Sequence, residues 1–232
     1  MSKLFEDLNE NQRQAVQHIE GASMIIAGAG SGKTRVLTYR IAYMISQGIN
    51  PFHILSLTFT NKAAKEMKDR VMNLLGNAMA HNVWMGTFHS IFNKILHIES
   101  NYLGFTSRFL VYDTTDAKNV IKSILKEKKL DDKQYRPGMV CAMISNAKAN
   151  LISAEEYTQN NLIAADNKAK RLDYLGEIYM AYQHRLRRAD SMDFDDLLFN
   201  MYILLRDFPE MLYKYQHKFK YILVDEYQDT RR

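Results

Sequence analysis

Length, composition and charge exclude several kinds of protein. The chain has 232 residues, 47% of them hydrophobic, which suits one large domain or two small ones with a sizeable core. A single cysteine, Cys141, excludes a disulfide framework and favours a reducing, cytoplasmic setting. No apolar run approaches the roughly 20 residues that span a bilayer, and the polar N-terminus does not resemble a signal peptide. The net charge of +5 permits a polyanionic partner without requiring one.

Strand and helix patterns alternate in the first part of the chain. Residues 23–27 (SMIIA) predict a short buried strand that ends at glycines, and residues 54–59 and 82–88 predict two more strands. Apolar residues at helical spacing predict helices over residues 34–47 and 63–75. This alternation indicates a parallel sheet with helices on its faces.

The middle of the chain, from about residue 90 to residue 218, has mainly helical periodicity, and only residues 109–113 look extended. Apolar stripes with spacings of three and four support this interpretation. The stripes are Val120, Ile121, Ile124 and Leu125; then Leu172, Leu175, Tyr179, Tyr182 and Leu186; then Phe194, Leu197, Leu198, Met201 and Leu205.

A further strand is predicted at residues 221–225 (YILVD), buried on both faces because its first four residues are apolar. Strands therefore precede and follow the helical block. We predict an α/β domain formed by residues 1–93 and 219–232, with an all-helical subdomain inserted at residues 94–218.

A glycine-rich segment follows the first predicted strand and precedes the first predicted helix, which is the context of a P-loop. Glycines let backbone amides turn toward phosphate oxygens, and the helix N-terminus adds a positive dipole end. Lys33 offers a charge to the β- and γ-phosphates, and Thr34 offers a hydroxyl to Mg²⁺. The predicted phosphate-binding residues are Ala27, Gly28, Ala29, Gly30, Ser31, Gly32, Lys33 and Thr34, with Ala27 in place of the usual first glycine.

Two acids at the end of the strand at 221–225 predict the second half of this site. Asp225 would hold Mg²⁺ through water, and Glu226 would orient or deprotonate an attacking water. An apolar strand that ends in Asp-Glu is weak evidence alone and strong evidence beside a P-loop. We therefore expect Lys33 and Asp225 to converge from adjacent strands on one triphosphate–magnesium pocket.

Six segments, in this order, resemble the motifs of superfamily 1 DNA helicases of the UvrD/Rep/PcrA type. They are residues 8–12 (LNENQ) with Ala15 and Val16, 27–35 (AGAGSGKTR), 57–67 (LTFTNKAAKEM), 86–90 (GTFHS), 193–198 (DFDDLL) and 225–230 (DEYQDT). The resemblance covers nearly the whole chain. It implies a RecA-like P-loop NTPase sheet with helices on both faces and an inserted all-helical subdomain.

The resemblance also implies roles for single residues at the nucleotide. Gln12 would read the adenine edge, Arg35 would pack near the base, and Gln228 would couple the γ-phosphate state to neighbouring elements. The implied catalytic residues are Lys33, Asp225, Glu226 and Gln228, and the implied metal ligands are Thr34 and Asp225.

For DNA, the resemblance implies contacts along a bound single strand. The residues concerned are Phe59, Thr60, Asn61, Thr87, Phe88 and His89. Aromatic faces stack on bases without sequence preference, and Thr and Asn side chains hold phosphates in position. Without this motif context, Phe59 and Phe88 would be interpreted as core residues, and Trp84 is interpreted so.

The implied function is that of an ATP-dependent 3′–5′ DNA helicase that uses ATP and Mg²⁺ and acts on single-stranded DNA and a duplex junction. The family continues with a second RecA-like domain that carries arginine fingers, so we expect this N-terminal part alone to be nearly inactive. Two alternatives remain: an ATP- or DNA-binding module without turnover, and a helicase subunit of a helicase–nuclease.

Charged clusters in the helical block have competing interpretations. Lysines at 118, 122, 126, 128, 129 and 133, and arginines at 185, 187 and 188, favour solvated helix faces over a duplex-DNA contact. Asp193, Asp195 and Asp196 favour a helix cap over a metal cluster, because acids at a helix start bind its free amides.

Overall fold

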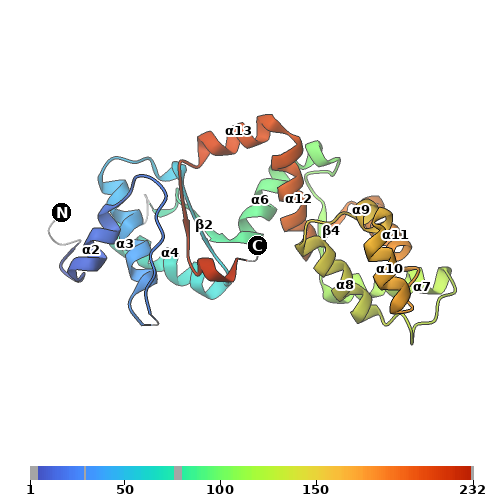
Figure 1. Ribbon diagram of the computed structural model, residues 1–232. Helices are drawn as coiled ribbons and strands as arrows, with labels where there is room; N and C mark the ends of the chain where they lie inside the picture. The colour runs from blue at the N-terminus through green and yellow to red at the C-terminus, as the bar shows by residue number, and fades with distance from the viewer. Residues whose placement is uncertain (1–4, 29, 76–79, 231–232) are drawn as a thin grey trace. The chain divides into compact units, whose positions relative to one another are not determined.

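The computed structural model describes residues 5–28, 30–75 and 80–230 (Figure 1). The chain divides into two compact units. Unit 1 consists of Met1–Ile91 and Glu210–Arg232, and unit 2 consists of Phe92–Pro209. Each unit is described by itself.

Unit 1 is a mixed α/β unit. Its helices are α2 (Glu10–Gln17), α3 (Lys33–Ser46), α4 (Asn61–Leu75) and most of α13 (Pro209–Lys218), and α6 (Phe88–Glu99) begins in it. Its strands are β1 (Ile54–Thr58), β2 (Trp84–Thr87) and β5 (Tyr221–Val224). The strands form one parallel sheet in the order β2-β1-β5. The three strands predicted at 54–59, 82–88 and 221–225, and the two helices predicted at 34–47 and 63–75, are confirmed within two residues at each end.

The central strand β1 is buried along its whole length. Leu55 pairs with Trp84 of β2 on one side and with Ile222 of β5 on the other. Side chains alternate between the two faces of a strand. On one face, Ile54 and Leu223 pack with Ile41 of α3, so this helix covers that face of the sheet.

The strand predicted at residues 23–27 does not form. Residues 22–28 run without regular structure, and Met24 and Ile26 are 69% and 89% exposed. The prediction that β5 is buried on both faces is also wrong, because Ile222 is 61% exposed. Both errors have one cause: apolar sequence favours a strand, but the ladder of hydrogen bonds and the cover of each face come from neighbours.

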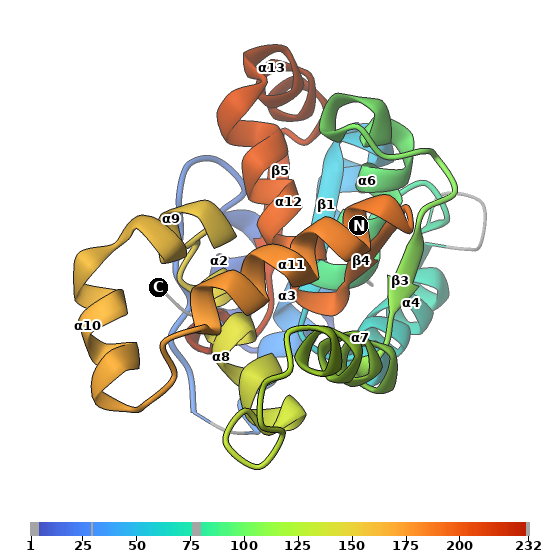
Figure 2. The same cartoon turned by 90° about the vertical axis from the view of Figure 1, so that its right-hand side faces the viewer.

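Unit 2 is mainly helical. Its helices are α7 (Thr114–Glu127), α8 (Pro137–Ala149), α9 (Ala154–Gln159), α10 (Asn161–Ala169), α11 (Leu175–Arg188) and α12 (Phe194–Asp207), and the rest of α6 belongs to it. Helix α7 packs against α8 and against α11 (Figure 2). The three helices share a core that includes Ile121, Val140 and Tyr179. No helix in the described ranges has both the length and the apolarity needed to cross a bilayer.

Two short strands interrupt the helices of unit 2. Strand β3 (Leu110–Tyr112) lies within the predicted extended residues 109–113, and it pairs in parallel with β4 (Ser191–Asp193), which the sequence did not predict. Three residues are too few to show a period, so β4 carries no local signal.

The buried face of α12 differs from its predicted stripe. Leu197, Met201 and Leu204 are buried, whereas Phe194 and Leu198 are 57% and 38% exposed. Apolar residues occupy more than one face of this helix, so the sequence pattern leaves the choice of buried face to the packing around it.

Candidate functional site

The glycine-rich segment before α3 forms a closed turn. Gly30 and Gly32 have φ angles of +76° and +87°, a left-handed conformation that glycine adopts without the strain of a side chain. The Ser31 hydroxyl donates to the Gly28 carbonyl at 2.7 Å, and the Ser31 N–H donates to the same oxygen at 3.3 Å. Ala29, predicted as part of the loop, lies outside the described residues.

Lys33 is folded back onto this turn. Its Nζ atom donates to the carbonyl oxygens of Ala27 at 3.1 Å and Gly28 at 3.3 Å. A lysine ammonium has three donors and no acceptor, so phosphate oxygens would suit it as well as carbonyl oxygens do. A phosphate would also bind it more strongly, because both partners of the hydrogen bond would then be charged.

Thr34 connects the loop with the end of β5. Its hydroxyl donates to Oδ2 of Asp225 at 3.3 Å, and the N–H of Asp225 donates to the Leu57 carbonyl of β1 at 2.9 Å. Burial and the neighbouring Glu226 carboxylate raise the pKa of Asp225 above its usual value. The Thr34 hydroxyl and the Lys33 ammonium oppose this shift without cancelling it. The two halves of the predicted site therefore lie together.

The route by which these halves meet differs from the prediction. Lys33 and Asp225 were expected to converge from adjacent strands, but residues 23–27 form no strand beside β5. The loop reaches Asp225 through the first turn of α3, which begins at Lys33.

Glu226 follows Asp225 in a strained backbone conformation. Its φ angle is +53°, which is uncommon for a residue with a side chain and occurs often at functional sites. Its N–H donates to Oδ1 of Asp225 at 3.1 Å, and the Gln228 amide donates to its carboxylate. The turn thus gathers the three polar side chains Asp225, Glu226 and Gln228 directly after the strand.

Gln12 also lies at the loop. Its Nε2 donates to the Ser31 carbonyl at 2.9 Å, and its Oε1 accepts the N–H of Asn9 at 3.0 Å. Arg35 is exposed in the first turn of α3 and donates to the Asp7 carbonyl at 3.3 Å. Asn9 was not predicted as a site residue, although Asn-x-x-Gln before a helix is a variant of the capping-box pattern and signals this arrangement.

The residues at this site fit magnesium and a nucleotide. The Thr34 hydroxyl and the Asp225 carboxylate are hard oxygen ligands within hydrogen-bond distance of each other, and Mg²⁺ prefers such ligands. Among the described residues no group of three or more His, Cys, Asp and Glu side chains could hold a metal ion. An ion at Thr34 and Asp225 would therefore need further oxygen ligands from phosphates and water.

The residues predicted to contact single-stranded DNA gather where β1 and β2 end. Thr58 pairs with Thr87 across these strands, so Phe59 and Phe88 follow at the same edge of the sheet. Their ring centroids lie 5.3 Å apart at an interplanar angle of 50°, and Phe59 is 38% exposed. The two rings form an aromatic pair at the surface of unit 1 rather than in its core.

The polar members of the same set support helix starts. The Thr60 hydroxyl accepts the N–H of Ala63 at 3.1 Å in α4, and the buried Thr87 hydroxyl accepts the N–H of Ser90 at 3.2 Å in α6. Asn61 is exposed as the first residue of α4, and His89 is half-buried as the second residue of α6.

A second group of one lysine and two acids is buried in unit 2. Lys148 Nζ lies 2.7 Å from Oδ2 of Asp193 and 2.8 Å from Oδ1 of Asp196. The Tyr182 hydroxyl donates to Asp193 at 2.9 Å, and the Gln183 amide donates to Asp196 at 3.1 Å. The two aspartates form a capping box at the start of α12, which confirms the helix-cap interpretation. Lys148 itself was missed, because no sequence spacing links it to α12.

Three residues of the basic runs make contacts within unit 2. Lys128 pairs with Glu177 at 2.7 Å, Arg185 pairs with Glu127, and Arg187 lies over the ring of Phe105. The side chains of Lys128 and Arg185 are 33% and 30% exposed, and the choice between a solvated face and a duplex-DNA contact stays a prediction.

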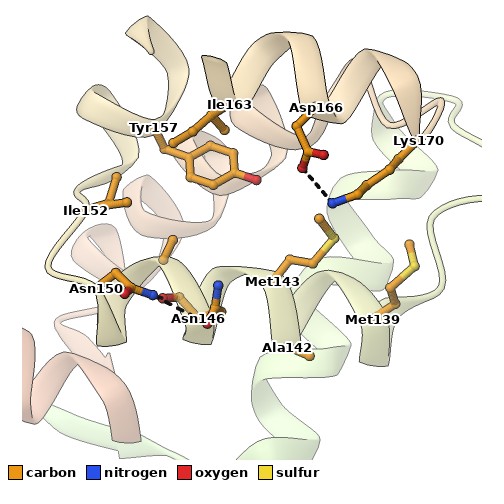
Figure 3. Close-up of a pocket in the computed structure, with 11 residues that line it drawn as sticks. Met139, Ala142, Met143, Asn146, Asn150, Ile152, Tyr157, Ile163, Asp166 and Lys170 are labelled. Atoms are coloured by element: carbon orange, nitrogen blue, oxygen red, sulfur yellow. Dashed lines mark hydrogen bonds and ion pairs between the residues drawn. The ribbon is translucent and has the colours of Figure 1, made fainter. Parts of the chain in front are cut away.

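A cavity of about 500 Å³ lies in unit 2 between α8 and α10 (Figure 3). Its walls include Met139, Met143 and Ile163, and the ion pair between Lys170 and Asp166 lies at its edge. None of the residues predicted for nucleotide or DNA lines this cavity.

Fold and site together define the class. A parallel sheet, a glycine-rich loop that leads into a helix, and a threonine bonded to an acid at a strand end characterise a P-loop α/β protein. Within that class the chain belongs to the UvrD/REP helicase N-terminal domain family, whose model matches residues 8–232. The resemblance stated from the motifs is thereby confirmed.

Curated relatives agree with this assignment. The chain is 43% identical to the ATP-dependent DNA helicase PcrA of Staphylococcus aureus (strain Mu50 / ATCC 700699) and 44% identical to that of Staphylococcus epidermidis (strain ATCC 12228 / FDA PCI 1200). Each match covers 100% of this chain and 31% of the relative. The chain thus spans about a third of the length of these relatives.

Proposed function

We propose that this chain is the N-terminal, ATP-binding part of an ATP-dependent 3′–5′ DNA helicase, which couples ATP hydrolysis to movement on single-stranded DNA and to duplex unwinding. The observation that carries the proposal is the hydrogen bond between Thr34 and Asp225, because it joins the phosphate-binding loop to the acidic end of the sheet. Dependence on ATP and action on DNA are what the relatives' names state of those proteins. The direction of movement rests on the motif resemblance.

The first step assigned to this site is phosphate binding. The loop amides and the N-terminus of α3 would surround the phosphate oxygens. Lys33 would exchange the carbonyls of Ala27 and Gly28 for the β- and γ-phosphates. Thr34 and Asp225 would hold Mg²⁺, which when bound offsets the charge on the transferring phosphoryl group.

The second step is activation of the attacking water. Glu226 would accept a hydrogen bond from that water and orient it, because it follows the Mg²⁺-binding Asp225 directly. Gln228 holds the Glu226 carboxylate and would transmit the γ-phosphate state to neighbouring elements. Gln12 would bind the adenine edge, and Arg35 would pack near the adenine ring.

The aromatic pair Phe59 and Phe88 would stack on the bases of a single strand, at ~1–3 kcal/mol per base. Thr60, Asn61, Thr87 and His89 are proposed as further contacts along that strand. The side chains of Thr60 and Asn61 would donate to phosphate oxygens, which fixes position without reading sequence. Unit 1 would act as the RecA-like motor domain and unit 2 as its inserted subdomain.

Nucleotide titration tests the proposal directly. The wild-type chain should bind Mg-ATP, and Lys33→Ala should weaken binding about 10- to 100-fold, because a hydrogen bond between charged groups is lost. Lys128→Ala, a change in an exposed ion pair of unit 2, serves as the matched control and should bind as the wild type does. Equal affinity of the wild type and Lys33→Ala would contradict the proposed site.

Turnover is expected to need the remainder of the longer protein. An arginine finger contributes ~10³–10⁵ in rate, and we propose that a second RecA-like domain supplies it. A steady-state ATPase assay with single-stranded DNA should therefore show little turnover by the 232 residues alone. Robust DNA-stimulated turnover would refute this part of the proposal.

A further inference from the structure

We infer that Gln12 is a positioning residue for the phosphate-binding loop, so that affinity for phosphate itself, and not only for the base, depends on its side chain. The inference rests on the proposed nucleotide site and extends it. The implied role of Gln12 at the adenine edge involves the base alone. The contact between Gln12 and the Ser31 carbonyl is a contact to the loop.

The orientation of the Gln12 carboxamide is determined by its two partners. Nε2 faces the Ser31 carbonyl at 2.9 Å, and Oε1 faces the backbone N–H of Asn9 at 3.0 Å. A carbonyl needs a donor and an N–H needs an acceptor, so a flipped carboxamide would lose both bonds. The Gln12 N–H in turn donates to the Asn9 side chain at 2.9 Å, which completes the capping box of α2.

Gln12 is anchored on a helix that packs against α3. Val16 of α2 is fully buried and clusters with Leu8 and with Val36 of α3. The side chain of Gln12 therefore projects from a fixed support to the loop that precedes α3. A hydrogen bond from a fixed support restricts the position of its partner more than one from a mobile side chain does.

The hydrogen bond from Gln12 holds the loop at Ser31. The N–H and the hydroxyl of Ser31 both donate to the Gly28 carbonyl, and the Ser31 carbonyl accepts from Gln12. The next residue, Gly32, allows the close approach: a Cβ atom there would meet Nε2 of Gln12 at 3.0 Å. The loop before α3, whose amides are proposed to bind phosphate, is thus fastened to α2 at Ser31.

The same carboxamide can hold the loop and read a base at once. It has two N–H groups and two acceptor lone pairs, and the bonds to Ser31 and Asn9 use one of each. One N–H and one lone pair remain for the edge of a purine. The two roles use different N–H groups and lone pairs of the carboxamide. Binding of a ligand without a base therefore reports on the loop contact alone.

The experiment compares Mg-ATP with magnesium tripolyphosphate, which carries phosphates and no base. Gln12→Met has a similar shape and lacks both the amide donor to Ser31 and the amide oxygen that accepts the N–H of Asn9. It should bind tripolyphosphate about fivefold more weakly than the wild type, as expected for the loss of one neutral hydrogen bond that orders the loop. Gln14→Met, the same substitution at an exposed position of α2, should bind both ligands as the wild type does.

A second variant separates loop positioning from helix stability. Asn9→Ala removes the side chain that accepts the Gln12 N–H and leaves the bond from Gln12 to Ser31 in place. It should lower the thermal unfolding temperature and keep the affinity for tripolyphosphate. If Asn9→Ala loses as much tripolyphosphate affinity as Gln12→Met, stability of α2 explains the effect and the inference is overturned.

The remaining outcomes distinguish the inference from the proposed function. Wild-type affinity of Gln12→Met for tripolyphosphate, with weaker binding of ATP, would confine Gln12 to the base and overturn the inference alone. Failure of the wild-type chain to bind either ligand would overturn the proposed function and the inference together.

Discussion

Two groups of one lysine and two acids, both among the described residues, differ in how their charges are satisfied. In unit 2, Lys148 lies 2.7–2.8 Å from Asp193 and Asp196, and its side chain is 1% exposed. In unit 1, Lys33 donates to backbone carbonyls, while Asp225 accepts from a threonine hydroxyl at 3.3 Å.

The difference shows what separates a structural ion cluster from a binding site. In the cluster of unit 2, the Lys148 ammonium pairs with both carboxylates and offsets one of their charges, and Tyr182 and Gln183 donate further hydrogen bonds to them. In the site of unit 1, the ammonium faces neutral carbonyls and the acids Asp225 and Glu226 lie side by side. A ligand that carries both anionic oxygens and a divalent cation would complement both parts, and the Mg-ATP of the proposed function has this composition.

The pKa shifts of the buried cluster follow from the same geometry. Burial by itself disfavours the ammonium of Lys148, yet Asp196 and Asp193 outweigh burial and raise its pKa above the ordinary value. Burial also opposes ionisation of Asp193, but the Lys148 ammonium holds the pKa of that carboxyl below its usual value. Both shifts favour the charged pair of Lys148 and Asp193, whereas burial and the Asp193 carboxylate raise the pKa of Asp196 and disfavour its ionisation.

The largest expected effect is the loss of the ammonium in the buried cluster. Lys148→Met should lower the free energy of unfolding by ~3–5 kcal/mol, because two buried carboxylates lose their counter-charge. Urea denaturation followed by circular dichroism measures this. Lys128→Met, in a partly exposed ion pair, is the matched control and should cost only ~0–1 kcal/mol. Similar losses in both variants would show that the buried cluster contributes no more to stability than a partly exposed ion pair.

The pH dependence of that variant provides a second test. Without Lys148, burial would raise the pKa values of Asp193 and Asp196 above their unfolded value near ~4. The folded state then binds more protons than the unfolded state, so the stability of Lys148→Met should rise as pH falls from 7 toward ~4, by up to ~1.4 kcal/mol per pH unit for each additional proton bound.

In the wild type, the contribution of Asp193 should have the opposite sign at low pH, whereas burial raises the pKa of Asp196, so that carboxyl keeps the sign it has in Lys148→Met. The folded pKa of Asp193 is lowered, so its contribution is complete above ~4 and is lost as pH falls through that lower value. Parallel stability curves for the wild type and Lys148→Met would contradict the assigned charges.

Asp225→Asn tests the open site of unit 1. The amide keeps the size of the carboxylate and removes its charge, so the gain in ATP affinity produced by Mg²⁺ should shrink roughly tenfold, while ATP binding without metal should not weaken. Fluorescence titration with and without Mg²⁺ measures both quantities. An unchanged Mg²⁺ effect would exclude Asp225 as a metal ligand.

Gly32→Ala is expected to have the smallest effect on stability. A φ of +87° costs a residue with a side chain ~1–2 kcal/mol, and the new Cβ would also meet Gln12. Gly48→Ala has nearly the same φ, +86°, with open space around it, and should cost as much. Only Gly32→Ala should also weaken ATP binding. Equal nucleotide affinities of the two variants would show that the approach of Gln12 to Gly32 has no role in binding.

Much of the fold and of the site was predictable because its signals are local. Strands β1, β2 and β5 are short apolar runs, and α3 and α4 have clear helical spacing, so each was located within two residues at each end. The loop that leads into α3 and the acids after β5 were recognised from residue type and order. The capping role of Asp193 and Asp196 also follows from their spacing of three.

Only the tertiary structure determined which predicted strands form, which side chains are buried and which distant groups pair. Residues 23–27 have the composition of a strand and form none, Ile222 is exposed, and α12 buries a face that its apolar pattern does not single out. Lys148 reaches Asp193 across 45 positions, and Gln12 reaches Ser31 across 19. Local sequence determines backbone preference and periodicity, whereas strand pairing, burial and ion pairing depend on groups distant in the chain, which only the folded structure brings together.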